Sequence, residues 1–181
     1  MQLERTSEDT DINSYHLDII YHYVDLIKPK SIIDVGCGTG YLLKILDKRL
    51  TKCSLKGIDF NCPSSLNFKT NNDLEFIKDD IYTSLLSFES NSIDLIICAH
   101  VLEHLSNPEK LIKQMRRITK NNLILICPLE KPYKWGMNYH VQFFRNSKNF
   151  VNFVSRDKKK SSSFSFHERI GDCLYVENKK A

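Results

Sequence analysis

Apolar residues recur along this chain with two periods, one typical of buried strands and the other of amphipathic helices. Short apolar runs predict strands at residues 32–35, 54–58, 74–78, 92–99 and 123–127. Helical spacing of apolar residues predicts helices at 14–27, 41–50 and 108–119, and the polar stretch 61–72 predicts a loop or a short helix. Because strands and helices alternate, the pattern favours an α/β fold with a doubly wound, mostly parallel sheet and helices on both faces.

The C-terminal part of the chain has a different pattern. Residues 145–154 predict a short helix, and residues 161–170 and 173–178 predict two strands. The dipeptide Gly171-Asp172 between these strands is typical of a tight turn. The sequence therefore predicts a C-terminal antiparallel hairpin. A total of 181 residues suits a single domain.

The cysteines and the N-terminus indicate whether the protein is cytoplasmic or secreted. The six cysteines include no C-x-x-C pair, and several lie within apolar runs, where a free thiol behaves as a small hydrophobic group. The first ten residues are polar and acidic, unlike the start of a secretory signal, and no apolar run approaches the roughly 18 residues of a membrane span. We therefore expect a cytoplasmic protein without a membrane span.

The net charge of +4 comes mostly from scattered lysines, with one run at residues 158–160. No basic helix or aromatic-interleaved basic patch accompanies that run in the sequence. The pattern indicates a solvated surface and does not favour a nucleic-acid partner. It leaves the oligomeric state open.

The richest chemical signal is the run Asp34-Val35-Gly36-Cys37-Gly38-Thr39-Gly40, which follows the first apolar strand and leads into a helix. Dinucleotide binding needs the spacing G-x-G-x-x-G, whereas here the third glycine comes one residue early and Tyr41 fills the expected place. The carboxylate of Asp34 would also repel a pyrophosphate, but it would attract a cofactor that carries an ammonium and a sulfonium. S-adenosylmethionine carries both groups.

This run closely resembles motif I of the class I S-adenosylmethionine-dependent methyltransferases, and the resemblance extends over about residues 31–130. It implies a Rossmann-like domain with a covering helix (1–30), a cofactor-binding core (31–130) and an acceptor-side loop with the terminal hairpin (131–181). It also implies that the methionyl part of the cofactor is held mainly by backbone groups of the glycine loop. The residues expected there are Asp34, Gly36, Cys37, Gly38, Thr39 and Gly40.

The ends of the later strands carry further candidate cofactor residues. Asp59, about 20 residues after the glycine loop and followed by Phe60, can accept hydrogen bonds from both ribose hydroxyls. By resemblance to the family, Asp80 and Ile81 would bind the adenine, and Ala99 and His100 would pack near the ligand. For any one aspartate the alternative is a helix cap or a turn. Their joint occurrence in family order favours the cofactor.

One departure from the family lies before the fifth strand, where a Lys-Pro-Gly-Gly turn is common. This chain has Thr119-Lys120-Asn121-Asn122. Because asparagine tolerates the left-handed conformation, these residues are compatible with a turn, and the departure does not change the predicted fold.

Methyl transfer from a sulfonium is an in-line displacement, so the protein mainly positions the acceptor and excludes water. A general base helps when the acceptor is a hydroxyl or a protonated amine. His140, in a segment that resembles the family's His-x-x-Phe-Phe, is the first candidate, and His104 is the second. Positioning, capping or packing is the alternative role for both.

Two further groups of residues could carry chemistry. Cys98, His100 and His104 lack the order of a zinc peptidase motif, and Cys98 should point into the sheet, so we expect no metal site there. Aromatic residues after the fifth strand form either a wall of the acceptor site or core under a long loop, and we favour the wall. These residues are Tyr133, Trp135, Tyr139, Phe143 and Phe144.

The sequence thus predicts an S-adenosylmethionine-dependent methyltransferase acting on a small molecule or a glycan precursor. Methylation of RNA or protein is one alternative, and a noncatalytic domain that binds the cofactor or a partner is another. A nucleotide-linked oxidoreductase is disfavoured by the glycine spacing and by Asp34.

Overall fold

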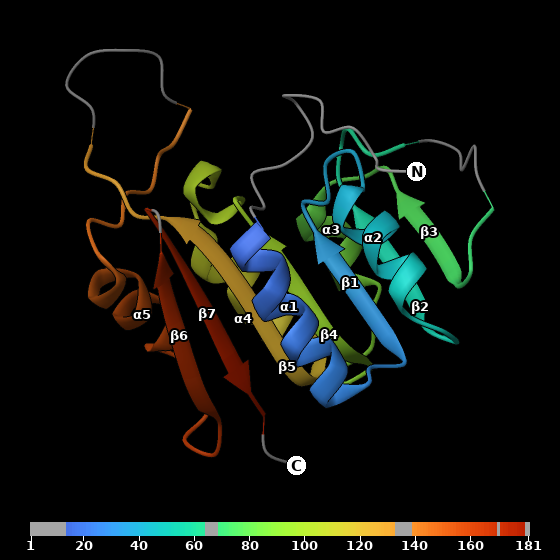
Figure 1. The fold of residues 1–181 in the computed structure, drawn as a ribbon. Helices are drawn as coiled ribbons and strands as arrows, with labels where there is room; N and C mark the ends of the chain where they lie inside the picture. The colour runs from blue at the N-terminus through green and yellow to red at the C-terminus, as the bar shows by residue number, and fades with distance from the viewer. Residues whose placement is uncertain (1–13, 64–68, 133–138, 170, 180–181) are drawn as a thin grey trace.

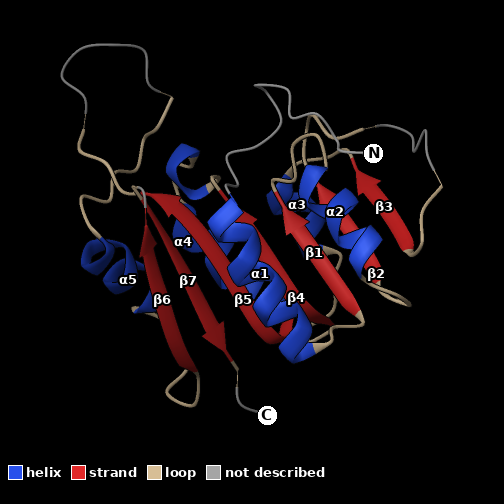
Figure 2. Ribbon diagram, in the orientation of Figure 1, coloured by secondary structure: helices blue, strands red, loops and turns tan. Residues whose placement is uncertain are grey.

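The computed structural model describes residues 14–63, 69–132, 139–169 and 171–179. Within these residues the strands form one seven-stranded sheet in the order β3-β2-β1-β4-β5-β7-β6 (Figure 2). The strands are β1 (Ser31–Val35), β2 (Ser54–Ile58), β3 (Asp73–Ile77), β4 (Ile93–Ala99), β5 (Thr119–Pro128), β6 (Ser163–Arg169) and β7 (Asp172–Asn178). The first five strands pair in parallel, and β7 pairs antiparallel with both β5 and β6. The predicted mostly parallel sheet with a C-terminal hairpin is confirmed.

Helices cover both faces of the sheet, as predicted (Figure 1). The helices are α1 (Ser14–Ile27), α2 (Tyr41–Arg49), α3 (Ile81–Leu86), α4 (Pro108–Ile118) and α5 (Ser147–Ser155). On one face, Ile20 of α1 and Leu43 of α2 belong to a buried apolar cluster with Ile97 of β4. On the other face, Met115 of α4 and Phe150 of α5 belong to a second buried cluster, together with residues of α3. The core is therefore split into two layers by the sheet.

The strand order positions the candidate site. Chain connections run from β1 outward to β2 and β3 on one side, and then to β4 and β5 on the other. The loops after β1 and β4 therefore diverge at the carboxyl edge of adjacent strands. In doubly wound folds this switch point is where ligands bind.

Residues 119–122, which the sequence left compatible with a turn, belong to β5. Thr119 ends α4 by donating its hydroxyl to the carbonyl of Met115, 2.7 Å away, and the chain passes directly into the strand. Ile93 pairs with Thr119 whereas Leu95 pairs with Asn122, so β5 holds one extra residue. A β-bulge takes the place of the turn.

One helix and one helix boundary also differ from the pattern. The six-residue helix α3 was not predicted, because fewer than two turns give no readable period. Helix α5 begins at Ser147 and not at 145, because the side chain of Asn146 accepts from the backbone N–H of Asn149 at 2.9 Å and caps the helix.

Part of the polar stretch 61–72, residues 64–68, lies outside the described residues. Its end is held by the carboxylate of Asp47, which accepts from the backbone N–H groups of Asn71 and Asn72 at 3.0 and 2.9 Å.

All six cysteines are described, and each is a buried free thiol. Among the described residues, no helix combines the length and apolar character needed to cross a membrane. The three-part division of the chain and the cytoplasmic location stay predictions.

Candidate functional site

The glycine loop joins β1 to α2 and is tied to the end of β2. The N–H of Gly36 donates to the carbonyl of Ile58 at 2.8 Å. Gly36 has a φ of +77°, and a Cβ there would lie 2.2 Å from a methyl group of Val101, so only glycine fits. Gly38 also has a positive φ, of +51°, but a Cβ there would meet no atom within 4 Å. Gly38 therefore borders open space.

Asp59 connects the glycine loop with the loop after β2. One carboxylate oxygen of Asp59 accepts from the N–H of Gly38 at 3.0 Å, and the other accepts from the N–H of Asn61 at 2.7 Å. These two bonds fix the carboxylate across from the glycine loop. Asp59 and the glycine loop, which the sequence predicted to bind the same cofactor, are thus in direct contact.

A cleft of about 480 Å³ lies between these loops and the loops after β3 and β4, which is a size suited to a small ligand. Eight of the predicted cofactor residues line it: Gly36, Gly38, Asp59, Phe60, Asp80, Ile81, Ala99 and His100. Sequence reasoning missed four others that border it, namely Asn61, Tyr82, Val101 and Leu105. Each of the four lies within three residues of a predicted site residue, so adjacency was the available signal. Phe60 is 61% exposed, although it is a large apolar side chain.

The predicted residues Asp34, Cys37, Thr39 and Gly40 do not line the cleft. Cys37 is buried in the core, Thr39 is exposed, and Gly40 precedes the first residue of α2. Asp34 is 3% exposed, and burial, followed by the charge of Asp59, raises the pKa of its carboxyl to about 7. Strand β1 thus places a carboxyl of unusually high proton affinity two residues before Gly36, which lines the cleft.

Asp80 combines two roles that the sequence left as alternatives. Its Oδ1 accepts from the backbone N–H of Thr83 at 2.9 Å, so it is the N-cap of α3. Asp80 also lines the cleft. Ile81, which follows it, is 8% exposed and belongs to the core, so its side chain is largely occupied by packing.

The two candidate bases lie side by side. The rings of His104 and His140 meet edge to face, with centroids 4.7 Å apart. Nδ1 of His140 pairs with the carboxylate of Glu130, a residue that sequence reasoning missed. A carboxylate on one ring nitrogen fixes the tautomer and stabilises the protonated ring, as in catalytic triads. His140 therefore has the local environment of a base, whereas His104 is exposed, with its Nδ1 3.4 Å from the carbonyl of Tyr139.

Glu103 holds the segment that carries His140. Its backbone carbonyl accepts from the N–H groups of Val141 and Gln142 at 2.7 and 3.0 Å. The loop after β5 is thereby fastened to the short 3-10 helix at Leu102–His104. This link explains how residues so far apart in sequence bring His104 and His140 into contact.

The expected aromatic wall is only partly within the described residues, since Tyr133 and Trp135 lie outside them. Phe144 is 6% exposed and packs against Phe150 with ring centroids 5.0 Å apart, so for this residue the wall assignment is wrong and the core alternative holds. Tyr139 is 80% exposed.

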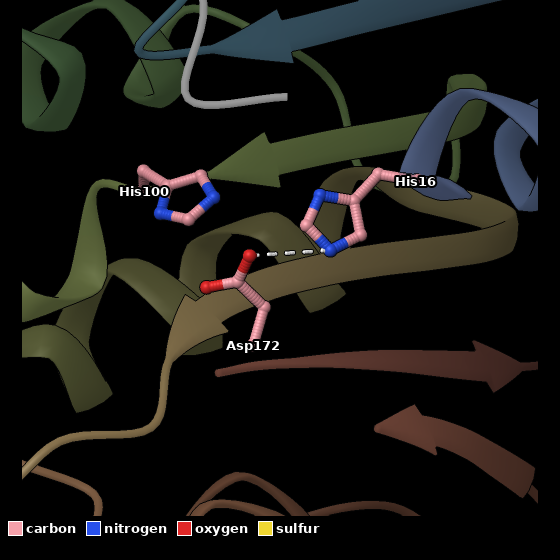
Figure 3. A group of neighbouring side chains, drawn as sticks. All are labelled: His16, His100 and Asp172. Atoms are coloured by element: carbon pink, nitrogen blue, oxygen red, sulfur yellow. Dashed lines mark ion pairs between the residues drawn. The ribbon is translucent and has the colours of Figure 1, made fainter. Parts of the chain in front are cut away.

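The grouping of Cys98, His100 and His104 does not occur. Cys98 is fully buried in the core, and burial raises the pKa of its thiol well above the usual range. His100 lies instead with His16 of α1 and Asp172 of β7 (Figure 3). Sequence reasoning missed both partners. The available signal was that His16 occupies a buried position four residues before Ile20 on the apolar face of α1.

The Nε2 of His16 lies 3.5 Å from a carboxylate oxygen of Asp172, a contact that is an ion pair only when the imidazole is protonated. His16 is 1% exposed, and burial, followed by the charge of His100, lowers its pKa to about 4. At neutral pH this imidazole is therefore uncharged.

The fold and the cleft define a doubly wound α/β protein with a ligand site at the switch point of its sheet. The family model described as "Methyltransferase domain" matches residues 33–127. The chain therefore belongs to this methyltransferase family, as the resemblance predicted, and this assignment supports S-adenosylmethionine, the predicted cofactor.

Relatives and solved structures agree with this family. The chain is 30% identical over 149 residues to a ubiquinone biosynthesis O-methyltransferase of Neisseria meningitidis serogroup C, covering 80% of this chain and 56% of the relative. It is 27% identical over 177 residues to a tRNA U34 carboxymethyltransferase of Nautilia profundicola, covering 86% and 56%. The chain thus spans little more than half the length of these relatives. The fold matches the plantazolicin methyltransferase BpumL, solved in complex with a monoazolic desmethylPZN analog and SAH, with a TM-score of 0.64, 18% identity and coverage of 88% and 80%.

Proposed function

We propose that this chain transfers a methyl group from S-adenosylmethionine to a small-molecule or glycan-precursor acceptor by in-line displacement. One observation carries the proposal. A cleft of ligand size, bordered by the glycine loop and Asp59, lies at the same edge of the sheet as His104, whose ring contacts the His140–Glu130 pair. The residues proposed to bind the cofactor and the candidate bases therefore lie at the same edge of the sheet.

The cofactor roles follow the chemistry of the cleft. In the proposal Asp59 accepts from the ribose hydroxyls, the neighbourhood of Asp80 and Ile81 takes the adenine, and Phe60 offers an exposed apolar face. Ala99 and His100 border the ligand at the end of β4. The methionyl part lies along the glycine loop, where Gly36 and Gly38 border the cleft and the roles of Asp34, Cys37, Thr39 and Gly40 stay predictions.

The chemical step needs little more than placement and a base. The sulfonium is already an activated leaving group, so the acceptor must be held in line and water excluded. His140 takes the proton of an acceptor hydroxyl, and Glu130 stabilises the resulting imidazolium. His104 is the second candidate for this role.

Calorimetric titration with S-adenosylhomocysteine, with NAD as the control ligand, tests the first half of the proposal. Micromolar binding of the first ligand alone supports the assigned cleft, and a preference for NAD contradicts it. Transfer of a labelled methyl group to a panel of hydroxylated small molecules and glycan precursors tests the second half. Cofactor binding without transfer to any acceptor class would instead support a noncatalytic cofactor-binding domain.

RNA is the second candidate acceptor, because one relative is named as a tRNA carboxymethyltransferase.

A protein that binds RNA commonly presents a basic surface to the phosphates. Around α4, however, several basic side chains are engaged in bonds within the protein, which argues against such a surface there. Arg116 pairs with Glu177 at 2.7 Å, Arg117 donates to the carbonyls of Leu85 and Phe88, and Lys179 donates to the carbonyl of Arg116. Binding of tRNA that weakens steeply with added salt, together with methylation of that tRNA, would favour RNA over a small acceptor.

A further inference from the structure

We propose that His16, His100 and Asp172 form a binding site for a divalent transition-metal ion, with Zn²⁺ as the best match, beside the cofactor cleft. Metal binding at this site does not depend on the methyl-transfer proposal and is tested separately from it.

The three side chains converge from three parts of the chain and point toward one another (Figure 3). His16 lies in the first turn of α1, His100 directly follows β4, and Asp172 is the first residue of β7. Their ligand atoms all lie within 4.8 Å of one another, and the Nε2 of His16 is 3.5 Å from the carboxylate of Asp172. Ligands about 2.1 Å from a tetrahedral ion lie about 3.4 Å apart, so the pair of His16 and Asp172 already has ligand spacing. The other pairs lie within 4.8 Å and would have to close by at most about 1.4 Å.

Two imidazoles and one carboxylate favour Zn²⁺ over hard ions such as Mg²⁺. Two imidazoles and one carboxylate are the protein ligands of many catalytic zinc sites, which keep a fourth position for water or substrate. Hard ions such as Mg²⁺ prefer sites made of oxygen alone. Because His100 also lines the cleft, an ion here would be adjacent to the bound ligand.

Glu103 supplies the supporting contact that metal-binding histidines commonly have. Its carboxylate is 1% exposed and lies 3.5 Å from Nδ1 of His100, and its other oxygen accepts from the thiol of Cys127. A carboxylate at Nδ1 holds the proton there and leaves the lone pair of the ring on Nε2. Together with Asp172 it also provides two negative charges, which balance a divalent ion.

The backbone conformation of His100 fixes the direction of its side chain. Its φ is +54°, in the left-handed region that side chains other than glycine rarely adopt. The N–H of His100 donates to the carbonyl of Ile126 of β5 at 3.0 Å, which holds this conformation in place. Such strain is kept at sites where the direction of a side chain matters.

A second group, Glu103, His104 and His140, also has ligand atoms within 4.8 Å of one another. There the carboxylate of Glu103 already contacts His100 and Cys127, and His104 is exposed. Recruiting Glu103 as a ligand would disturb these contacts. The geometry therefore favours the group of His16, His100 and Asp172.

The test is titration of the chelator-treated chain with Co²⁺, followed by absorption spectroscopy and by displacement with Zn²⁺. We expect one tightly bound ion per chain with the visible bands of a four-coordinate site. His16→Gln and Asp172→Asn should each lower the affinity at least about ten-fold, and Glu103→Gln, which removes the support of His100, should lower it by about 10- to 100-fold. His22→Gln, at an exposed histidine of the same helix, is the matched control and should bind as the wild type does.

Circular dichroism establishes which variants fold. If those at His16 or Asp172 do not, ring ¹⁵N spectra of the wild type with and without Zn²⁺ decide the question, because the nitrogens of both His16 and His100 should shift. Absence of any bound ion in the wild type overturns the proposal. Binding that survives His16→Gln and Asp172→Asn but is lost in His140→Gln also overturns it, because the ion then belongs to the second group.

Discussion

The buried carboxyl of Asp34 should make the stability of this fold fall as the pH rises toward neutrality. Burial, and then the charge of Asp59, raises its pKa from 3.8 to about 7. A raised pKa in the folded state stabilises the fold fully below pH 3.8, and this contribution is lost as the pH rises through about 7. At about 1.4 kcal/mol per pKa unit the whole contribution is about 4 kcal/mol, of which about 3 kcal/mol is lost between pH 5 and pH 8.

Asp34→Asn isolates this effect, because asparagine keeps the size of the side chain but does not titrate. Urea unfolding of the wild type and the variant should show the variant gaining about 3 kcal/mol relative to the wild type between pH 5 and pH 8. Asp18→Asn, at an exposed position of α1, serves as the control and should leave the pH dependence unchanged. Parallel pH profiles for Asp34→Asn and the wild type would refute the assigned pKa.

The protonation of the Asp34 carboxyl, which affects the stability of the fold, should also change when the cofactor binds. A ligand that brings an ammonium and a sulfonium close to Asp34 favours its ionised form. Binding of S-adenosylmethionine near pH 7, where about half of the Asp34 carboxyls are protonated, should therefore release up to about half a proton per chain. Calorimetry in two buffers of different ionisation enthalpy measures this release directly, and it should disappear in Asp34→Asn.

Three further predictions concern the site. Asp59→Ala should weaken binding of S-adenosylhomocysteine by about 1–3 kcal/mol in calorimetry, and a folded variant with wild-type affinity would remove the ribose assignment. His140→Ala and Glu130→Gln should each lower kcat by about 10²-fold or more with little change in cofactor affinity; a wild-type rate on the true acceptor would retire His140 as the base. Gly36→Ala should destabilise the fold by about 1–3 kcal/mol in urea unfolding, because its Cβ would meet Val101; adding Val101→Ala should recover part of this loss, and no recovery would show that backbone strain dominates.

The sheet was predictable because its strands are short apolar runs between turn residues and helical repeats. The cofactor edge was predictable for a related reason, since the carboxyl ends of parallel strands meet and residues at those ends become neighbours. Asp59 and Gly38 illustrate this, being 21 residues apart in sequence and joined by a hydrogen bond. Helix α3 and the bulge at the start of β5 were not predictable, because one is too short for a period and the other is set by its pairing with β4.

The group of His16, His100 and Asp172 was beyond sequence reasoning for another reason. Asp172 lies where turn chemistry already explains an aspartate, and His16 lies on the apolar face of a helix. Each residue therefore has a sufficient local explanation. Only the packing of α1 over β4, β5 and β7 brings them together, and that packing is set by side chains far apart in the chain.

The role of Glu103 could not be inferred from the sequence, because it depends on contacts with residues far away in the chain. The sequence left open whether Glu103-His104 positions other groups or transfers protons. In the structure the backbone carbonyl of Glu103 fixes Val141 and Gln142, next to the candidate base His140, while its carboxylate lies against His100. One residue thus holds both the proposed base and the proposed metal ligand. A change at Glu103 should therefore affect turnover and metal affinity together, whereas a change at His140 should affect turnover alone.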